Sequence, residues 1–123
     1  LARVYCVNLD RRAERWSILR RQFGRMRMRV ARWPATDGSV LGADSLQRLC
    51  ATGVLAREAL VRLSLPAEER YFGVDLTLES LGAALSHMQI WRDIIRRSVR
   101  DAGPAAPAFL VVEDACEFEG GLD

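Results

Sequence analysis

Half of the 123 residues are hydrophobic and 28% are charged, a composition that excludes a disordered protein and suits one globular domain. No apolar run approaches the 18 residues of a transmembrane segment, and Cys6, Cys50 and Cys116 are too widely spaced for a disulfide framework or a C-x-x-C zinc site. We interpret them as reduced thiols. The net charge of +2 conceals a gradient, because residues 1–32 carry ten arginines against two acids, residues 33–100 balance, and residues 101–123 carry six acids and no base. The basic N-terminal segment is suited to binding phosphates. The acidic C-terminal segment is suited to holding a metal ion or to pairing with the arginines of the N-terminal segment.

The first predicted unit is a strand, a turn and a helix. Residues 4–7 form an apolar run of the buried-strand type, and the apolar residues that follow have helical spacing up to Gly24, which we expect to end the helix. Asp10 is the expected N-cap. Backbone N–H groups at a helix start, together with guanidinium groups, suit a phosphate or pyrophosphate, although each arginine taken alone reads as a solvated residue. The polar side chains expected at this turn are Asn8, Arg11, Arg12 and Arg15.

The middle of the chain is predicted to be mostly structural. Residues 27–31 alternate polar and apolar, which indicates a half-exposed strand that Trp33-Pro34 stops. Ala-Thr-Asp-Gly at 35–38 reads as a turn, with a ligand-facing Asp37 as the alternative. Residues 44–65 read as helical, with a capping box from Asp44 and breaks at Gly53 and Pro66. In the loop 66–76, Tyr71 and Phe72 have two interpretations, core packing and part of a lid, and we favour the core.

The longest helix is predicted from Thr77 to near Gly103. Its apolar stripe at helical spacing is interpreted as core, and it consists of Leu81, Ala84, Leu85, Met88, Trp91 and Ile95. Ser86 and His87 lie in mid-helix. His87 is the chain's one histidine, so no zinc triad is available, and Ser86 lacks the G-x-S-x-G context of a nucleophile.

After a Gly/Pro/Ala connector, the run Phe109–Val112 leads into Glu113 and Asp114. Such a continuous apolar run predicts a strand buried on both faces of a parallel sheet. Ligands of open α/β sheets bind beyond the carboxyl ends of the strands. Two acids at such an end indicate either a solvated turn or a bound cation.

Four segments in this order and spacing resemble glycosyltransferase family 25, which includes lipopolysaccharide and collagen-type galactosyltransferases. They are V-Y-C-V-N-L-D-R-R-A-E-R-W, A-T-D-G, L-T-L-E-S-L-G-A-A-L-S-H-M-Q-I-W and F-L-V-V-E-D-A-C-E-F. The resemblance implies one glycosyltransferase-like domain over residues 1–123, an α/β fold of the GT-A, Rossmann-like type with a mostly parallel sheet flanked by helices. It also implies that the chain is the N-terminal part of a larger catalytic domain.

The resemblance further implies transfer of a hexose, typically galactose, from a UDP-sugar to a glycan, a lipid-linked saccharide such as lipopolysaccharide, or a protein, with inversion. Glu113 and Asp114 would hold Mn²⁺, and the catalytic base would lie beyond Asp123. A nucleic-acid partner is disfavoured, because no such binding motif accompanies the arginines. The residues that would line the nucleotide-sugar pocket are Asn8, Arg11, Arg15, Asp37, Gly38, Ser86 and His87.

The chain departs from the family pattern at Ala115, where the family usually has a third acid. Side chains two apart on an extended strand share a side, so Glu113 lacks its natural chelating partner and Asp114 points the other way unless the chain turns. This departure motivates the alternative hypothesis of a degenerate, non-catalytic binding or adhesion module. Glu117 replaces the missing acid only if the chain folds back.

Overall fold

The computed structural model describes residues 1–100, 103 and 105–118. They fall into two compact units, one of Leu1–Thr36 with the described part of Leu85–Asp123, and one of Asp37–Ala84. The single domain expected over residues 1–123 stays a prediction. Among the described helices, none combines the length and the apolar character needed to cross a membrane.

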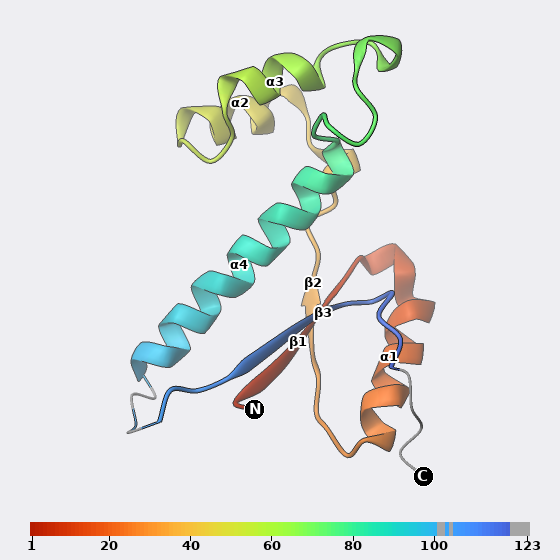
Figure 1. Ribbon diagram of the computed structural model, residues 1–123, viewed down its shortest axis with the longest axis vertical. Helices are drawn as coiled ribbons and strands as arrows, with labels where there is room; N and C mark the ends of the chain where they lie inside the picture. Colours follow the sequence, from red (N-terminus) through yellow and green to blue (C-terminus); the bar gives the residue numbers. More distant parts are fainter. Residues whose placement is uncertain (101–102, 104, 119–123) are drawn as a thin grey trace. The chain divides into compact units, whose positions relative to one another are not determined.

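The first unit is a parallel three-stranded sheet between two helices (Figure 1). The strands are β1 (Arg3–Asn8), β2 (Ala31–Pro34) and β3 (Phe109–Glu113), in the order β2-β1-β3. The expected α/β class with a parallel sheet flanked by helices is therefore confirmed. The finer assignment to the GT-A type stays a prediction.

Strand β1 is the middle strand, and its side chains alternate between two cores. Val4 and Cys6 pack with Leu19 and Phe23 of α1 (Ala13–Arg25), on one face of the sheet. On the other face, Tyr5 and Val7 pack with Ile90, which belongs to α4 (Leu78–Arg100), at positions set by the two-residue period of a strand. Burial raises the pKa of the Cys6 thiol to about 12, so Cys6 is an inert core residue. The three cysteines are free thiols in the described structure.

Both outer strands differ from their predictions. Strand β2 begins at Ala31, where the predicted strand ended, and it includes Trp33 and Pro34. Pro34 is tolerated because it is the last residue of a strand with one described neighbour, where its missing N–H breaks no ladder. The strand predicted at residues 109–112 packs on both faces, because Leu110 and Val112 contact the α1-side core and Phe109 and Val111 the α4-side core. It is buried less than predicted, since Val112 is its one buried residue.

The predicted ends of the two long helices, α1 and α4, are correct only in part. Asp10 does not cap α1, since it opens a short 3-10 turn, η1 (Asp10–Arg12), and no side chain caps the helix. Helix α1 continues one residue past Gly24. Thr77 does cap α4, because its Oγ1 accepts from the N–H of Ser80 at 3.1 Å. The region after Arg100, where we expected α4 to end, lies partly outside the described residues.

The predicted core stripe of α4 is wrong in part. Trp91 and Ile95 are 55% and 62% exposed, whereas Ile90 and Ser86 are fully buried. The sheet-facing side also carries Asp93, whose Oδ2 accepts from the hydroxyl of buried Tyr5 at 2.7 Å. Burial and the hydrogen bond to the Asp93 carboxylate raise the pKa of Tyr5. Counting apolar residues at helical spacing does not identify this sheet-facing side, because it combines Ile90 with the hydrogen-bonded polar residues Ser86 and Asp93.

The second unit is helical. It contains η2 (Gly38–Val40), α2 (Ala43–Ala51), α3 (Arg57–Leu63), η3 (Ala67–Glu69) and the first turns of α4. Gly53, at φ +76°, separates the two helices within the stretch predicted as helical. Gly42 precedes α2 as its N-cap, so Asp44 lies inside the first turn and makes no capping box.

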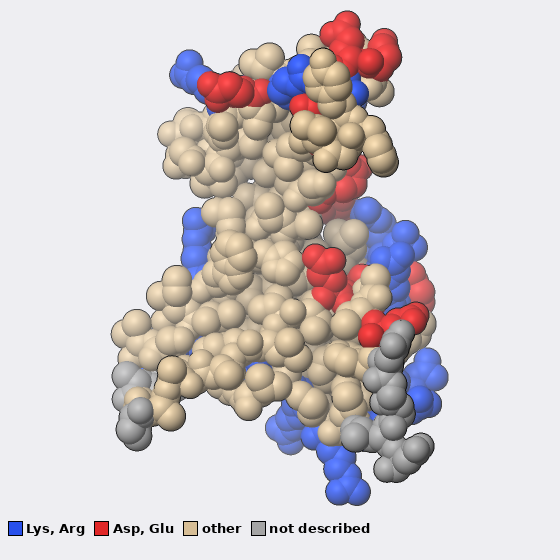
Figure 2. All heavy atoms as spheres, viewed as in Figure 1, with Lys and Arg blue, Asp and Glu red and all other residues tan. Residues whose placement is uncertain are grey.

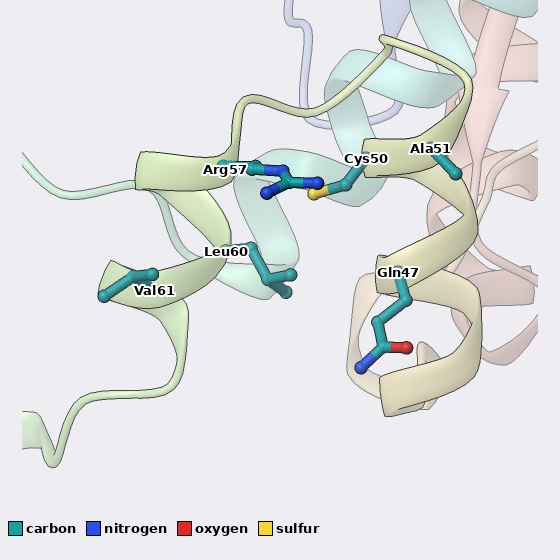
Figure 3. A pocket seen from close by; sticks show the side chains of 6 residues that line it. All are labelled: Gln47, Cys50, Ala51, Arg57, Leu60 and Val61. Atoms are coloured by element: carbon teal, nitrogen blue, oxygen red, sulfur yellow. The ribbon is translucent and has the colours of Figure 1, made fainter.

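Helices α2 and α3 border a hollow of about 380 Å³, where Cys50, Arg57 and Leu60 face one another (Figure 3). The core placement favoured for the loop aromatics is wrong, because Tyr71 and Phe72 are exposed. The loop that carries them is held by polar contacts rather than by the core.

Candidate functional site

The strand order places a topological switch point between β1 and β3. From β1 the chain passes through α1 to β2 on one side, and then through α4, on the other face, to β3 on the opposite side of β1. In open α/β sheets of this kind, ligands bind beyond the carboxyl ends of the strands at the point where the order reverses. In this chain that point lies at Asn8 and Glu113, where β1 and β3 end.

Asn8 is the centre of a hydrogen-bond network at this edge. Its side chain is 1% exposed, and its amide nitrogen donates to the Arg12 carbonyl at 3.0 Å and to Asp114 Oδ2 at 2.7 Å. Its Oδ1 accepts from Arg32 Nε at 2.8 Å. Every polar group of this buried amide is therefore bonded, as burial requires. Asn8 joins the turn after β1, strand β2 and the turn after β3.

Sequence reasoning missed Arg32. It lies opposite Cys6 in the parallel register, and its NH2 reaches Asp10 Oδ1 at 2.6 Å as well as the Asn8 carbonyl at 3.3 Å. A charged residue inside a short strand was the available signal. Its partners, however, are 22 and 24 residues away in sequence, so local patterns do not reveal them.

The arginines of the turn border the same edge. Arg15 NH1 lies 3.5 Å from Asp114 Oδ1, and Arg12 NH1 lies 3.6 Å from Glu14 Oε1. The side chains of Arg15 and Arg12 remain 43% and 47% exposed, whereas that of Asp114 is 13% exposed. Figure 2 shows acidic and basic side chains next to one another over this part of the first unit. Arg11 is exposed at the same turn.

The two carboxylates at the end of β3 lie on opposite faces of the sheet. Glu113 follows the parity of Phe109 and Val111, which pack on the α4 face, and its Oε1 lies 3.2 Å from His87 Nε2. Asp114 takes the other side, where Asn8 and Arg15 hold it. The alternation of side chains along the strand explains the separation.

The chain turns immediately after Glu113. The N–H of Cys116 donates to the Glu113 carbonyl at 3.0 Å, so residues 113–116 form a turn with Ala115 exposed at its tip. Cys116 then packs against the α1-side core. The ring of Phe118 contacts that of Phe23 edge-on, with 5.1 Å between the ring centroids. Because residue 115 does not continue the strand, the two-residue parity used to place a third acid does not extend to it.

The described residues do not fit a Mn²⁺ held jointly by Glu113 and Asp114. Within residues 1–100, 103 and 105–118, no group of three or more His, Cys, Asp or Glu side chains is placed to hold a metal ion. Asp114 already has an amide and a guanidinium as partners, and Glu113 faces His87 across the sheet. The Mn²⁺ expected from the family resemblance stays a prediction that this arrangement does not support.

Ser86 and His87 occupy neighbouring but different environments on α4. Ser86 is fully buried, and its hydroxyl accepts from the N–H of Thr36 at 2.8 Å, which fixes the chain after β2. Gln89 continues this contact by donating to Thr36 Oγ1 at 3.2 Å and accepting from Trp33 Nε1 at 3.3 Å. His87 is partly exposed beside Trp91. Of the two, His87 is accessible to a ligand.

Asp37 and Gly38 belong to the second unit. Asp37 Oδ1 accepts from the N–H and the hydroxyl of Ser39, at 3.0 and 2.6 Å, and so starts η2. A Cβ on Gly38 would lie 1.7 Å from the carbonyl oxygen of Leu78, which is why glycine occupies this position. These contacts give both residues a structural role, and their predicted place in a nucleotide pocket stays a prediction.

Comparison with known proteins assigns the chain to a family. A glycosyltransferase 25 family member of Drosophila melanogaster is 30% identical over 119 residues, which are 97% of this chain and 17% of that protein. Procollagen galactosyltransferase 1 of Danio rerio is 31% identical over 117 residues, which are 94% of this chain and 16% of that protein. A glycosyltransferase 25 family member of Aedes aegypti is 27% identical, again over 97% of this chain.

No family model matches the chain, and no solved structure matches it. The chain spans about a sixth of the length of the curated relatives it matches. The matches nevertheless cover nearly all of its own residues, including the switch-point turn and the end of β3. The chain belongs to glycosyltransferase family 25.

Proposed function

We propose that the chain is the nucleotide-sugar-binding part of a glycosyltransferase that transfers a hexose, galactose, from a UDP-sugar to a glycan, lipopolysaccharide or protein acceptor with inversion. The observation that carries the proposal is the polar cluster of Asn8, Arg15 and Asp114 at the switch point of a parallel sheet. Ligands of such sheets bind at this point. Membership of the glycosyltransferase family gives the ligand its chemical class.

The start of α1 supplies the groups that a diphosphate needs. No side chain caps this helix, so no capping side chain competes with an anion for its first N–H groups. The helix dipole also favours negative charge there. The guanidinium groups of Arg12 and Arg15 are partly exposed beside it. Planar guanidinium groups bind phosphate oxygens through paired hydrogen bonds. When the glycosidic bond breaks, the same groups would offset the charge that develops on the leaving diphosphate.

Asn8 and Asp114 act on this site as positioning residues. Asn8 holds Asp114, and Asp114 in turn draws the Arg15 guanidinium to the strand end. A diphosphate at the helix start would share Arg15 with Asp114. Inversion also requires a carboxylate base for the acceptor hydroxyl.

Binding of UDP tests the proposal. Titration calorimetry of the protein with UDP should give saturable binding, and Arg15→Gln should weaken it about tenfold or more, the usual effect of losing a charged hydrogen bond. Arg20→Gln removes the same charge from an exposed position further along α1 and serves as the matched control. Absence of UDP binding, or equal effects of the two variants, would contradict the proposal.

A second candidate function is a degenerate module that binds saccharides without transferring them. Ala115 in place of an acid favours it, as do the carboxylates on opposite faces of the sheet. Ala115→Asp separates the two candidates. Under the degenerate reading the parent protein shows no Mn²⁺-dependent UDP binding, and the variant gains it. UDP binding by the parent that is as strong as in the variant would count against the degenerate reading.

A further inference from the structure

The loop between η3 and α4 presents three apolar side chains to solvent. Tyr71 is 67% exposed, Phe72 is fully exposed and Val74 is 81% exposed. They lie within four residues of one another in the second unit. Apolar side chains grouped on a surface, rather than scattered over it, commonly mark a binding site.

Polar contacts hold this loop in shape. Arg62 of α3 donates from Nε to Asp75 Oδ1 at 2.9 Å and from NH2 to Asp75 Oδ2 at 2.6 Å. The N–H of Tyr71 donates to the same Oδ2 at 2.7 Å, and the guanidinium lies 5.1 Å from the centroid of the Tyr71 ring. Gly73 takes the positive φ of 74° that the bend needs. The aromatic side chains are therefore exposed on a braced loop, and their exposure does not result from a lack of contacts.

The loop and the start of α4 border a hollow of about 470 Å³, a size typical of small-molecule sites. Its lining includes the aromatic residues Tyr71 and Phe72 and the hydroxyl residues Thr77 and Ser80. The Thr77 hydroxyl donates to Ser80 Oγ at 2.9 Å, which leaves the proton of the Ser80 hydroxyl to donate to a ligand. Arg70 also lines it, and the Arg70 Nε is buried with no hydrogen-bond partner among the described residues. Buried donors of this kind are usually satisfied by a ligand or water.

This mixture of groups suits one kind of ligand. A sugar ring has an apolar face of C–H groups that stacks on aromatic side chains, and hydroxyl groups at its rim that pair with hydroxyl and guanidinium groups. An apolar peptide would use the aromatic side chains and leave the Arg70 Nε without a partner. We propose that the Tyr71–Phe72 loop and the start of α4 bind a sugar residue of the acceptor. The inference rests on the proposed glycosyltransferase function and names a subsite for its acceptor.

Saturation-transfer NMR on the protein tests the inference directly, with methyl β-galactoside and methyl β-glucoside as probes. We expect transfer to the ring protons of at least one probe, and a signal about fivefold lower in Phe72→Ala, as the loss of an aromatic contact predicts. Phe72 makes no core contact, so this variant should fold. Val40→Ala shortens another exposed apolar residue of the same unit and is the matched control, which should keep the signal.

Two results would overturn the inference. One is absence of transfer to both sugars, and the other is a signal that Phe72→Ala and Tyr71→Ala leave unchanged. A concentration-dependent dimer that Phe72→Ala abolishes, without sugar binding, would instead assign the loop to contact with a second copy. UDP binding is recorded separately on the same samples. Loss of sugar binding with UDP binding intact refutes the acceptor subsite alone, whereas absence of UDP binding refutes the proposed function.

Discussion

Polar networks have different roles in the two units. In the first unit, Asn8 is buried with every polar group bonded, and it fixes the strand ends at the switch point. In the second, the part-buried Arg62–Asp75 pair holds a loop whose aromatic side chains are exposed to solvent. Removing one partner of a fully buried network carries a large penalty, whereas a pair with one partner partly in solvent is partly screened. The same type of interaction should thus contribute very differently to stability in the two units.

Asn8→Ala should produce the largest loss. It leaves the Arg12 carbonyl without its amide donor, and it removes the partner of Asp114 Oδ2 and of Arg32 Nε. Unpaired buried polar groups cost about 1–3 kcal/mol each, so we expect unfolding in urea to show a loss of about 3 kcal/mol. Gln89→Ala removes an exposed amide with longer bonds and is the control, with a change within about 0.5 kcal/mol. Equal changes would show that burial of the network is unimportant.

Gly38→Ala should destabilise the second unit by about 2 kcal/mol, because the new methyl group must displace backbone and not a mobile side chain. The Cβ would lie 1.7 Å from the Leu78 carbonyl oxygen and 2.4 Å from its carbon. Hydrogen exchange localises the effect, since amides of α2 and α3 should lose protection while those of β1 keep theirs. Unchanged protection throughout would mean that this close approach does not exist.

Gly24→Ala should have a smaller effect of the opposite sign. Gly24 lies inside α1, and a Cβ at this position meets nothing within 4 Å. Alanine in a helix interior is favoured over glycine by about 0.5–1 kcal/mol, so the melting temperature of the variant should rise. A fall would indicate that Gly24 has a packing or binding role that its surroundings do not show.

Local patterns predicted the strand–turn–helix unit that begins the chain, because β1 and α1 each have a clear hydrophobic period. They also predicted that Glu113 and Asp114 would point apart, which follows from the period of a strand. They failed where distant residues decide. The bonds of Asn8 join residues 8, 32 and 114, and the sheet-facing side of α4 contains Asp93 because Tyr5 lies opposite. The loop that carries Phe72 is likewise held by an ion pair between residues 62 and 75.

The Arg62–Asp75 brace should show the smallest effect, and it should appear as a dependence on pH. Hydrogen bonds from Arg62 and from the Tyr71 N–H lower the pKa of Asp75 to about 2 from its ordinary value of 3.8. Because the folded pKa is the lower one, the stabilisation is fully present above the unfolded pKa and is lost as the pH falls from about 4 towards 2. The melting temperature of the wild type should therefore converge with that of Asp75→Asn over this interval and exceed it at neutral pH. A difference in melting temperature that stays constant across the interval would mean that the carboxylate does not hold the loop. The acceptor subsite proposed at the Tyr71–Phe72 loop would then lose its structural basis.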